Sequence, residues 1–211
     1  MPIKTVHLLG AGGHCRVVID ALLCCGWTTA AIRVRDDRAA LAGLSILGCR
    51  VETPVRPGRP LSGKVHAAVG SGAIRESLLL DSTLARRDWL AIVHPRASVA
   101  ASATLGEGVF VAAQAVVGPC ARIGAATIVN HGAVVDHDCS VGDFCHVAPL
   151  ASLGGGVQVG RGVLIGAGAR VLPEIRIGDG VVIGAGAVVI GHVPPGQTWQ
   201  GVPAQPSHKG Q

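Results

Sequence analysis

Branched aliphatic residues recur at every sixth position through the C-terminal half of the chain. From Val93 to Val189, every residue at this interval is Val, Leu or Ile. The residues two positions earlier are mostly Ala, Cys, Thr or Val, and the residues directly after are mostly Gly, Ala, Asn or Asp. Alternate residues of a β-strand share a face, so the repeated aliphatic residue and the residue two before it point to the same side. The small residue that follows suits a turn, where a left-handed backbone is least costly.

This hexapeptide repeat predicts one short strand and one corner in every six residues. Three such units make a triangular coil, and the coils stack by parallel pairing, so residues eighteen apart lie above one another. Each repeated aliphatic residue then points into the prism, where its burial stabilises the fold by ~1.5–3 kcal/mol. The repeat therefore predicts a stack of three-sided coils over residues 91–211.

The N-terminal part has a different pattern. The segment VHLLGAGGHCRVVIDAL begins as an apolar strand and passes through a Gly-rich turn at Gly10, Gly12 and Gly13. It continues as an amphipathic helix from about His14. Cys15 stands where a dinucleotide-binding fingerprint has its third glycine, so the turn is typical of a phosphate or nucleotide site without the full fingerprint.

The rest of this part completes a small α/β domain over residues 1–90. We expect strands at residues 30–35 and 65–70 and a second helix at residues 73–87. Asp36 and Asp37 follow the first of these strands, at the place where a ribose or base acceptor lies in a doubly wound sheet. A tight turn before a helix, with a solvated pair of carboxylates, is the alternative without a ligand.

Composition narrows the classes of function. Aromatic residues are 2% of the chain, Tyr is absent and Gly reaches 31, so the core is expected to consist of small aliphatic side chains. The net charge of +5 comes entirely from residues 1–90. A chain without a dense Arg/Lys run or many aromatic residues is not typical of nucleic-acid binding, so this basic part favours a small anionic ligand or a merely solvated surface.

Cysteines and hydropathy indicate the compartment. The seven cysteines form no CxxC pair, which favours free thiols in a reducing cytoplasm and no structural zinc site. The first residues lack the layout of a signal peptide, and the most apolar run, VVIGAGAVVI, is too short to span a bilayer. We expect a cytoplasmic protein that does not insert into membranes.

The segment VVDHDCSVGDFCH, residues 134–146, interrupts the apolar repeat with charged and polar residues. The repeat places His137 and Asp138 at a corner and His146 on a flat outer face. It places Cys139 and Cys145 inside, as packing residues. A corner imidazole beside a carboxylate can accept a proton near neutral pH, although a solvated corner residue has the same pattern. His131 lies one corner earlier and is expected to be an exposed histidine.

The hexapeptide repeat resembles the left-handed parallel β-helix of the hexapeptide-repeat acyltransferases, which are typically trimers with acyl-CoA sites between neighbouring prisms. Together with GAGGH near the N-terminus, the Asp36–Asp37 pair and the N-x5-DHD motif, it resembles the bacterial N-acetyltransferases that act on nucleotide-linked 4-amino-4-deoxy sugars. The sialic acid O-acetyltransferases share this plan. The resemblance extends from about Val6 to Ala204. Gln205 stands where the family has a basic residue after G-x-P-A.

The resemblance implies a Rossmann-like sugar-nucleotide-binding domain at residues 1–90 and a left-handed β-helix acyltransferase domain with a C-terminal tail at residues 91–211. It implies transfer of an acetyl group from acetyl-CoA to the 4-amino group of a UDP- or GDP-linked sugar by a homotrimer, without a metal and without nucleic acid.

It also implies roles for single residues. His137 is the expected general base, and Asp138 raises its basicity. The backbone N–H of Gly155 is expected to donate to the thioester oxygen, and the residues expected to contact acetyl-CoA are His146, Gly155, Ala167 and Ala185. The residues expected to bind the sugar nucleotide are Gly12, Gly13, His14, Asp36, Asp37, Gly70 and Asn130.

Three alternatives remain open. The first is an O-acetyltransferase that acts on sialic acid or a related sugar. The second is a zinc protein like the gamma-class carbonic anhydrases, with His131, His137 and His146 as ligands, although their spacings of six and nine residues depart from that family. The third is a sugar-nucleotide binder without catalysis that keeps the repeat as a trimer scaffold.

Overall fold

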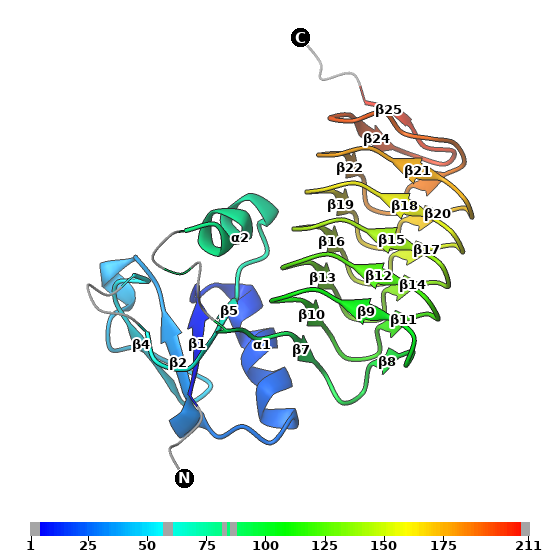
Figure 1. Ribbon diagram of the computed structural model, residues 1–211. Coiled ribbons are helices and arrows are strands. Elements are labelled where there is room, and N and C mark those ends of the chain that lie inside the picture. The colour runs from blue at the N-terminus through cyan, green and yellow to red at the C-terminus, as the bar shows by residue number, and fades with distance from the viewer. Residues whose placement is uncertain (1–4, 57–60, 82–83, 85–87, 208–211) are drawn as a thin grey trace.

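The structure is a computed structural model that describes residues 5–56, 61–81, 84 and 88–207 (Figure 1). An N-terminal α/β part lies beside the lower coils of a column of parallel strands, and the C-terminal end lies at the opposite end of that column. Among the described residues, no helix has both the length and the hydropathy needed to cross a membrane.

A six-stranded sheet organises the N-terminal part, in the order β3-β4-β2-β1-β5-β6. All neighbours pair in parallel except β3 and β4. The strands are β1 (Val6–Leu9), β2 (Ile32–Arg35), β3 (Ser45–Ile46), β4 (Cys49–Glu52), β5 (Lys64–Ala67) and β6 (Asp88–Trp89). Helix α1 (Gly13–Cys24) covers the face that carries Val6 and Leu8. Helix α2 (Gly72–Leu79) covers the other face, where Leu9 and Val65 pack.

Three predicted elements differ in extent. The strand expected at residues 65–70 is β5, which runs from Lys64 to Ala67, so its predicted extension to residue 70 was wrong. Short 3-10 helices, η1 (Thr29–Ala31) and η2 (Ala39–Leu41), flank β2, which begins at Ile32 rather than at residue 30. The second helix ends at Leu79, so its predicted extension to residue 87 was wrong. The sequence Asp-Ser-Thr follows at residues 81–83, and such short polar side chains compete with the helix for backbone hydrogen bonds. Residues 82, 83 and 85–87 lie outside the described residues.

The C-terminal part is a left-handed β-helix of hexapeptide repeats, as the repeat and the resemblance predicted. Every repeated aliphatic residue from Val93 to Val189 is the second residue of a two-residue strand. Strands pair in parallel with strands eighteen residues away, as in Val116↔Val134 and Val134↔Ser152. The aliphatic residues and those two before them fill the prism; Val135, Cys139 and Cys145 are fully buried.

Three sheets form the faces of this prism. Face 1 contains β7 (Ile92–Val93), β10 (Phe110–Val111), β13 (Ile128–Val129), β16 (His146–Val147), β19 (Leu164–Ile165), β22 (Val182–Ile183), β24 (Thr198–Gln200) and β25 (Gln205–Pro206). Face 2 contains β8 (Ser98–Val99), β11 (Val116–Val117), β14 (Val134–Val135), β17 (Ser152–Leu153), β20 (Arg170–Val171) and β23 (Val188–Val189). Face 3 contains β9 (Thr104–Leu105), β12 (Arg122–Ile123), β15 (Ser140–Val141), β18 (Gln158–Val159) and β21 (Arg176–Ile177).

At each corner, the residue with a left-handed backbone comes later in the repeat than we predicted. The residue directly after each aliphatic position is small because the next coil passes close by: a Cβ on Gly118 would lie 2.7 Å from the backbone nitrogen of His137. The positive φ falls two residues further on, for example at Asp138 (φ 59°) and Gly156 (φ 71°). Close packing between coils, rather than turn conformation, therefore selects the first small residue.

The two parts share an apolar contact. Outward side chains of face 1 lie in a column, and its lower members Ile92, Phe110 and Ile128 pack against α1. His146 is the next member of the same column, above Ile128. Helix α1 is thereby seated on face 1 below the level of His146.

Candidate active site

His137 and Asp138 form a hydrogen-bonded pair at an exposed corner between faces 2 and 3. The Nδ1 atom of His137 lies 2.8 Å from Oδ2 of Asp138, and both side chains are more than half exposed. An ionised carboxylate only accepts hydrogen bonds, so Nδ1 carries the proton and donates it. The neutral imidazole then presents an unprotonated Nε2 away from Asp138.

Two carboxylates act on this imidazole. The hydrogen bond that His137 donates to Asp138 raises the pKa of His137, and the charge of Asp136 adds to this effect. Asp136 also accepts the backbone N–H of His137 at 2.7 Å, which holds the start of the corner. The sequence motif included Asp136, but the expected mechanism gave it no role.

Gly155 lies directly above His137, one coil higher. A Cβ built on Gly155 would lie 2.5 Å from both Cε1 and Nε2 of His137, so the imidazole fits only because this residue has no side chain. Within the described part of the chain, the backbone N–H of Gly155 donates no hydrogen bond. A proton acceptor and an open N–H donor therefore lie side by side at this corner, the arrangement that acyl transfer needs.

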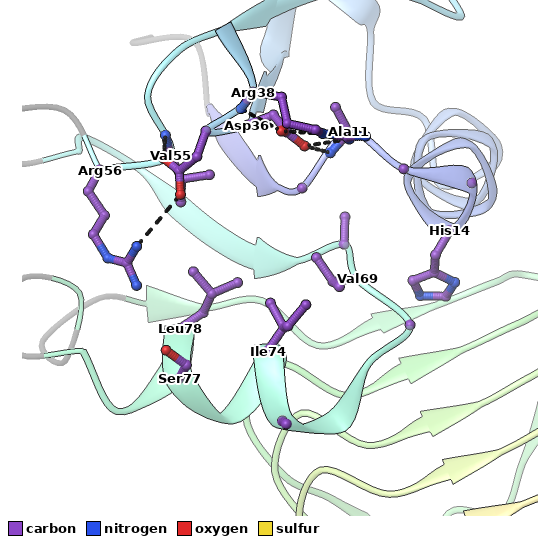
Figure 2. A pocket seen from close by; sticks show the side chains of 17 residues that line it. Ala11, His14, Asp36, Arg38, Val55, Arg56, Val69, Ile74, Ser77 and Leu78 are labelled. Atoms are coloured by element: carbon purple, nitrogen blue, oxygen red, sulfur yellow. Dashed lines mark hydrogen bonds and ion pairs between the residues drawn. The ribbon is translucent and has the colours of Figure 1, made fainter. Parts of the chain in front are cut away.

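A cavity of about 520 Å³ lies in the N-terminal part, between the ends of β1, β2 and β5 and helix α2 (Figure 2). All six N-terminal residues expected to bind the sugar nucleotide line it. These are Gly12, Gly13, His14, Asp36, Asp37 and Gly70. Apolar side chains of α2 and the preceding loop, among them Val69, Ile74 and Leu78, form a second wall.

Asp36 fixes the shape of this pocket. Its Oδ2 accepts the Ala11 N–H at 2.8 Å, and its two oxygens accept Nε and Nη2 of Arg38 at 2.8 and 2.9 Å. The hydrogen bonds from Arg38 hold the pKa of Asp36 well below its usual range. Both oxygens are therefore already engaged, and Arg38, which sequence reasoning missed, adds its cation to the pocket wall.

Asp37 is more open. Its Oδ1 accepts the backbone N–H of Val55 at 2.9 Å, while its Oδ2 lies 3.8 Å from Nη1 of Arg56. The side chain of Asp37 is 62% exposed. Of the two carboxylates, Asp37 has the oxygen with room for a hydrogen bond from a ligand.

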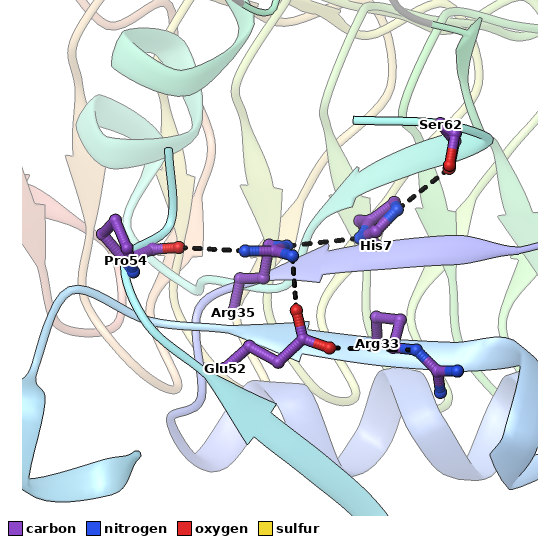
Figure 3. Close-up of polar contacts among 6 residues, drawn as sticks. All are labelled: His7, Arg33, Arg35, Glu52, Pro54 and Ser62. Carbon is purple, nitrogen blue, oxygen red and sulfur yellow. Dashed lines mark hydrogen bonds and ion pairs between the residues drawn. The ribbon is translucent and has the colours of Figure 1, made fainter. Parts of the chain in front are cut away.

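A buried polar network holds the strand ends behind the pocket (Figure 3). Arg35, at the end of β2, donates to Nδ1 of His7 at 3.3 Å, to the Pro54 carbonyl at 3.3 Å and to Glu52. His7 in turn contacts the Ser62 carbonyl at 2.9 Å. Burial lowers the pKa of His7, so its ring stays neutral and able to accept from Arg35. The network anchors the strand end from which Asp36 and Asp37 project.

The Gly-rich turn offers backbone donors at the start of α1. No described residue accepts a hydrogen bond from the N–H groups of Gly12, Gly13 and His14. Open N–H groups at a helix N-terminus suit the oxygens of a phosphate. The ring of His14 stands edge-on to Phe110, with centroids 5.2 Å apart, at the side of the pocket next to the β-helix. Burial lowers the pKa of His14 to about 3.

Asn130 and His146 lie on the β-helix and, unlike the six N-terminal residues, do not line the cavity. The amide Oδ1 of Asn130 accepts the N–H of His131 at 2.9 Å, so its Nδ2 faces Nε2 of His146 at 3.0 Å. Burial lowers the pKa of His146 to about 4, although the contact of its ring with the backbone of Gly70 acts to raise this pKa. His146 is therefore neutral at physiological pH and lies where the pocket meets the β-helix.

The predicted coenzyme residues Ala167 and Ala185 lie on another edge. Both are exposed at the corner between faces 1 and 2, with Gly186 bonded to the Ala167 carbonyl at 2.8 Å. His131 lies lower on the same edge, under Leu150. One chain thus places His137 and Gly155 on one edge and Ala167 and Ala185 on the next. In one chain, His131 and His137 lie on two different edges and His146 lies on a face. This separation does not favour a zinc site with three imidazole ligands.

One group of metal-ligating side chains lies elsewhere in the described residues. Ligand atoms of Asp20, Cys24 and His94 lie within 4.8 Å of one another. Nδ1 of His94 accepts the N–H of Arg96 at 3.0 Å, so its neutral ring carries the proton on Nε2. A ring in this state has no free lone pair for a metal, and this group lies apart from the pocket and the His137 corner.

Two family models match different parts of the chain. The model of the PglD N-terminal domain matches residues 5–80, and the model of the bacterial transferase hexapeptide (six repeats) matches residues 156–191. A search of curated proteins finds no match.

Several solved structures are similar over nearly the whole chain. A histidine-to-asparagine mutant of perosamine N-acetyltransferase from Caulobacter crescentus, in complex with CoA and GDP-perosamine, is 36% identical with a TM-score of 0.89, over 98% of each chain. The acetyltransferase domain of PglB from Neisseria gonorrhoeae FA1090 is 34% identical with a TM-score of 0.89, over 97% of this chain and 100% of that one. WeeI from Acinetobacter baumannii AYE is 25% identical with a TM-score of 0.79, over 97% and 100%. The chain therefore belongs to the hexapeptide-repeat sugar acetyltransferases that carry a PglD N-terminal domain.

Proposed function

We propose that this protein transfers the acetyl group of acetyl-CoA to the 4-amino group of a nucleotide-linked deoxy-amino sugar. Residues 1–90 would bind the sugar nucleotide and residues 91–211 the acetyl donor. The observation that carries the proposal is the corner where Nε2 of His137, oriented by Asp138, lies against Gly155. The similar perosamine enzyme was solved with CoA and GDP-perosamine, and the PglB domain also with acetyl coenzyme A.

His137 acts as the general base. A sugar amine is largely protonated near neutral pH and attacks a thioester only after it loses a proton, which Nε2 accepts. The nitrogen then forms a bond to the acetyl carbon, and the Gly155 N–H donates to the oxyanion that develops. As this bond forms, the nitrogen must lose a second proton: Nε2 passes the first proton to solvent, accepts the second, and delivers it to the sulfur as the carbon–sulfur bond breaks, which yields the neutral amide, free CoA and one proton in solvent. Asp138 stabilises the imidazolium during this step.

The nucleotide is held by the pocket of the N-terminal part. Open N–H groups of Gly12 and Gly13, together with Arg38, suit the diphosphate, and Asp37 suits the N–H groups of a base or the hydroxyls of a ribose. The sugar then points past His14 and Gly70 toward Asn130. Asp36 contributes by holding the turn and Arg38 in place.

We further propose that the working unit is a homotrimer with its sites between chains. The His137 edge and the Ala167 edge of one chain are separated by face 2, so a neighbouring prism is needed to bring base and coenzyme residues together. We also propose a cytoplasmic location, where the seven cysteines would stay free thiols. Light scattering tests the assembly, with an expected mass three times the 21.2 kDa of one chain.

The enzyme assay should use acetyl-CoA with a panel of UDP-, GDP- and CMP-linked 4-amino sugars and with free sialic acid, while free thiol is followed. We expect thiol release with at least one nucleotide-linked amino sugar, together with an acetamide in the product. Release with sialic acid alone, with an ester as product, would contradict the proposal in favour of O-acetylation.

A further inference from the structure

Arg75, on α2, is a buried cation, and no carboxylate among the described residues pairs with it. Its side chain is 1% exposed. All five of its N–H donors are used, and every acceptor is a backbone carbonyl. Burial lowers the pKa of Arg75 to about 10, so the guanidinium remains charged at neutral pH.

The acceptors lie on both sides of the joint between the two parts. Nη1 donates to the carbonyls of Val69 and Gly70 at 3.1 and 2.6 Å, in the loop that walls the nucleotide pocket. Nε donates to Ala126 at 2.6 Å, and Nη2 donates to Phe144 and Cys145 at 2.8 and 2.9 Å, all in the β-helix. One planar group therefore fixes the pocket wall to the prism.

The backbones at this joint are in direct contact. A Cβ on Gly72 would lie 2.5 Å from the Phe144 carbonyl oxygen, so α2 begins as close to the β-helix as a backbone can. Gly70 also bonds to His146, which holds Asn130. The loop that Arg75 holds is thus the point where the pocket meets the polar side chains of face 1.

Stability alone does not require a buried guanidinium at the joint between the two parts. The lower part of the same joint is apolar, with Ile92, Phe110 and Ile128 against α1. Apolar contacts tolerate sliding and repacking, whereas a rigid guanidinium fork with five carbonyl partners admits one geometry. Burying an unpaired charge is costly, so its presence points to a need for orientation.

We propose that Arg75 is a positioning residue for acetyl transfer. It holds the sugar-nucleotide pocket at a fixed distance and angle from the β-helix, so that the amine of the bound sugar reaches the site of transfer. This inference rests on the proposed function. Arg75 touches neither substrate in this account; it acts through Val69, Gly70 and α2.

The test compares Arg75→Lys and Arg75→Met with two further variants. Gly72→Ala keeps Arg75 but presses the Phe144 carbonyl away, so it disturbs the same joint by another route. Arg161→Ala is the control, because Arg161 pairs with Glu76 at 2.7 Å across the same joint but is about half exposed, and such pairs contribute little.

Two acceptors are measured for each variant, the nucleotide-linked amino sugar and the same amino sugar without its nucleotide. We expect kcat with the linked sugar to fall ~10²-fold in Arg75→Lys and Gly72→Ala, since a misplacement of about 1 Å costs that much. The KM for acetyl-CoA and the slow rate with the free sugar should not change, because the free sugar does not depend on the pocket. Arg161→Ala should match the wild type in every measure.

Other outcomes separate a structural role from a positioning role. The inference would be overturned if a variant lost the same fraction of its rate with the linked sugar and with the free sugar, or if the loss followed the melting temperature alone. An unchanged kcat in Arg75→Lys, at a temperature where the variant is folded, would also overturn it. If the wild type acetylates no nucleotide-linked sugar, the proposed function itself has failed, whatever the variants do.

Discussion

At the residue scale, the corner at His137 combines three features that depend on one another. Asp138 occupies a left-handed position that few residues other than glycine, asparagine and aspartate adopt readily, and this conformation brings its carboxylate to Nδ1 of His137. Gly155 leaves room for the ring one coil above. The sequence could predict that His137 lies at a corner beside a carboxylate. The period of eighteen residues also places Gly155 above His137, but it could not predict that the ring lies against Gly155, because that contact depends on the side-chain conformation of His137.

Removal of the Asp138 charge should shift the pH profile. The pKa of His137 is raised above its ordinary value, so the base becomes neutral only above about pH 6.5, and the acidic limb of kcat/KM should lie above that pH. In Asp138→Asn the carboxylate charge is lost, and the limb should move to lower pH while kcat falls. Asp179→Asn, on the third edge, is the control. An acidic limb that stays at the same pH would contradict the role of Asp138.

A methyl group on Gly155 should displace the imidazole without straining the backbone. Gly155 does not have a positive φ, so alanine is compatible with its backbone, but the added Cβ would overlap the ring of His137. We expect kcat in Gly155→Ala to fall ~10²-fold with an unchanged melting temperature. Gly191→Ala is the matched control on the same edge, where a Cβ meets no atom within 4 Å. Wild-type kcat in Gly155→Ala would show that the ring does not need this space.

At the element scale, the repeat predicted the β-helix strand by strand because each strand has the same environment. The period of six fixes which residues point inward, and stacking repeats this environment in every coil. The N-terminal sheet was predicted less completely. Strands β3 and β6 are only two residues long, which is too short for a pattern, and β4 (Cys49–Glu52) lacks the continuous apolar run that marks β1.

A core position of the repeat should be far more sensitive than an outer position. Leu153 is 1% exposed inside the prism, so Leu153→Ala should lower the free energy of unfolding by ~2–5 kcal/mol. Leu172 is 46% exposed, and Leu172→Ala should change the free energy of unfolding by less than about 0.5 kcal/mol. Urea unfolding followed by circular dichroism measures both. Similar losses in the two variants would contradict the inward orientation of the repeated residue.

At the scale of the whole molecule, the function depends on how two parts meet. The hydrophobic pattern predicted each part but not their joint, because Arg75 has no signal in the sequence: an arginine in an amphipathic helix is ordinarily exposed. The hydrophobic pattern likewise could not predict that His14 and His146 lie on either side of this joint. Within the described residues, the pocket and the His137 corner lie in different parts of one chain, so contact between chains is part of the proposed site.

Stability should fall on acidification because buried histidines at the joint must stay neutral. Burial lowers the pKa of His66 and His146 to about 4 and that of His14 to about 3. Below pH 6.5 the unfolded chain therefore binds more protons than the folded chain. Each of these histidines then lowers the free energy of unfolding by roughly 1.4 kcal/mol per pH unit, until the pH reaches its pKa in the folded state. Urea unfolding at pH 7 and pH 5 measures this. His66→Gln should reduce the slope, and equal stability at both pH values would contradict the burial of these rings.

The most direct test of the account is the initial rate of CoA release by the assembled His137→Ala variant, with acetyl-CoA and the nucleotide-linked amino sugar that the wild type uses best. We predict that the rate falls ~10²–10⁴-fold, with the mass of the assembly and the circular dichroism spectrum unchanged. Near-normal turnover by that variant would contradict the assignment of His137 as the base.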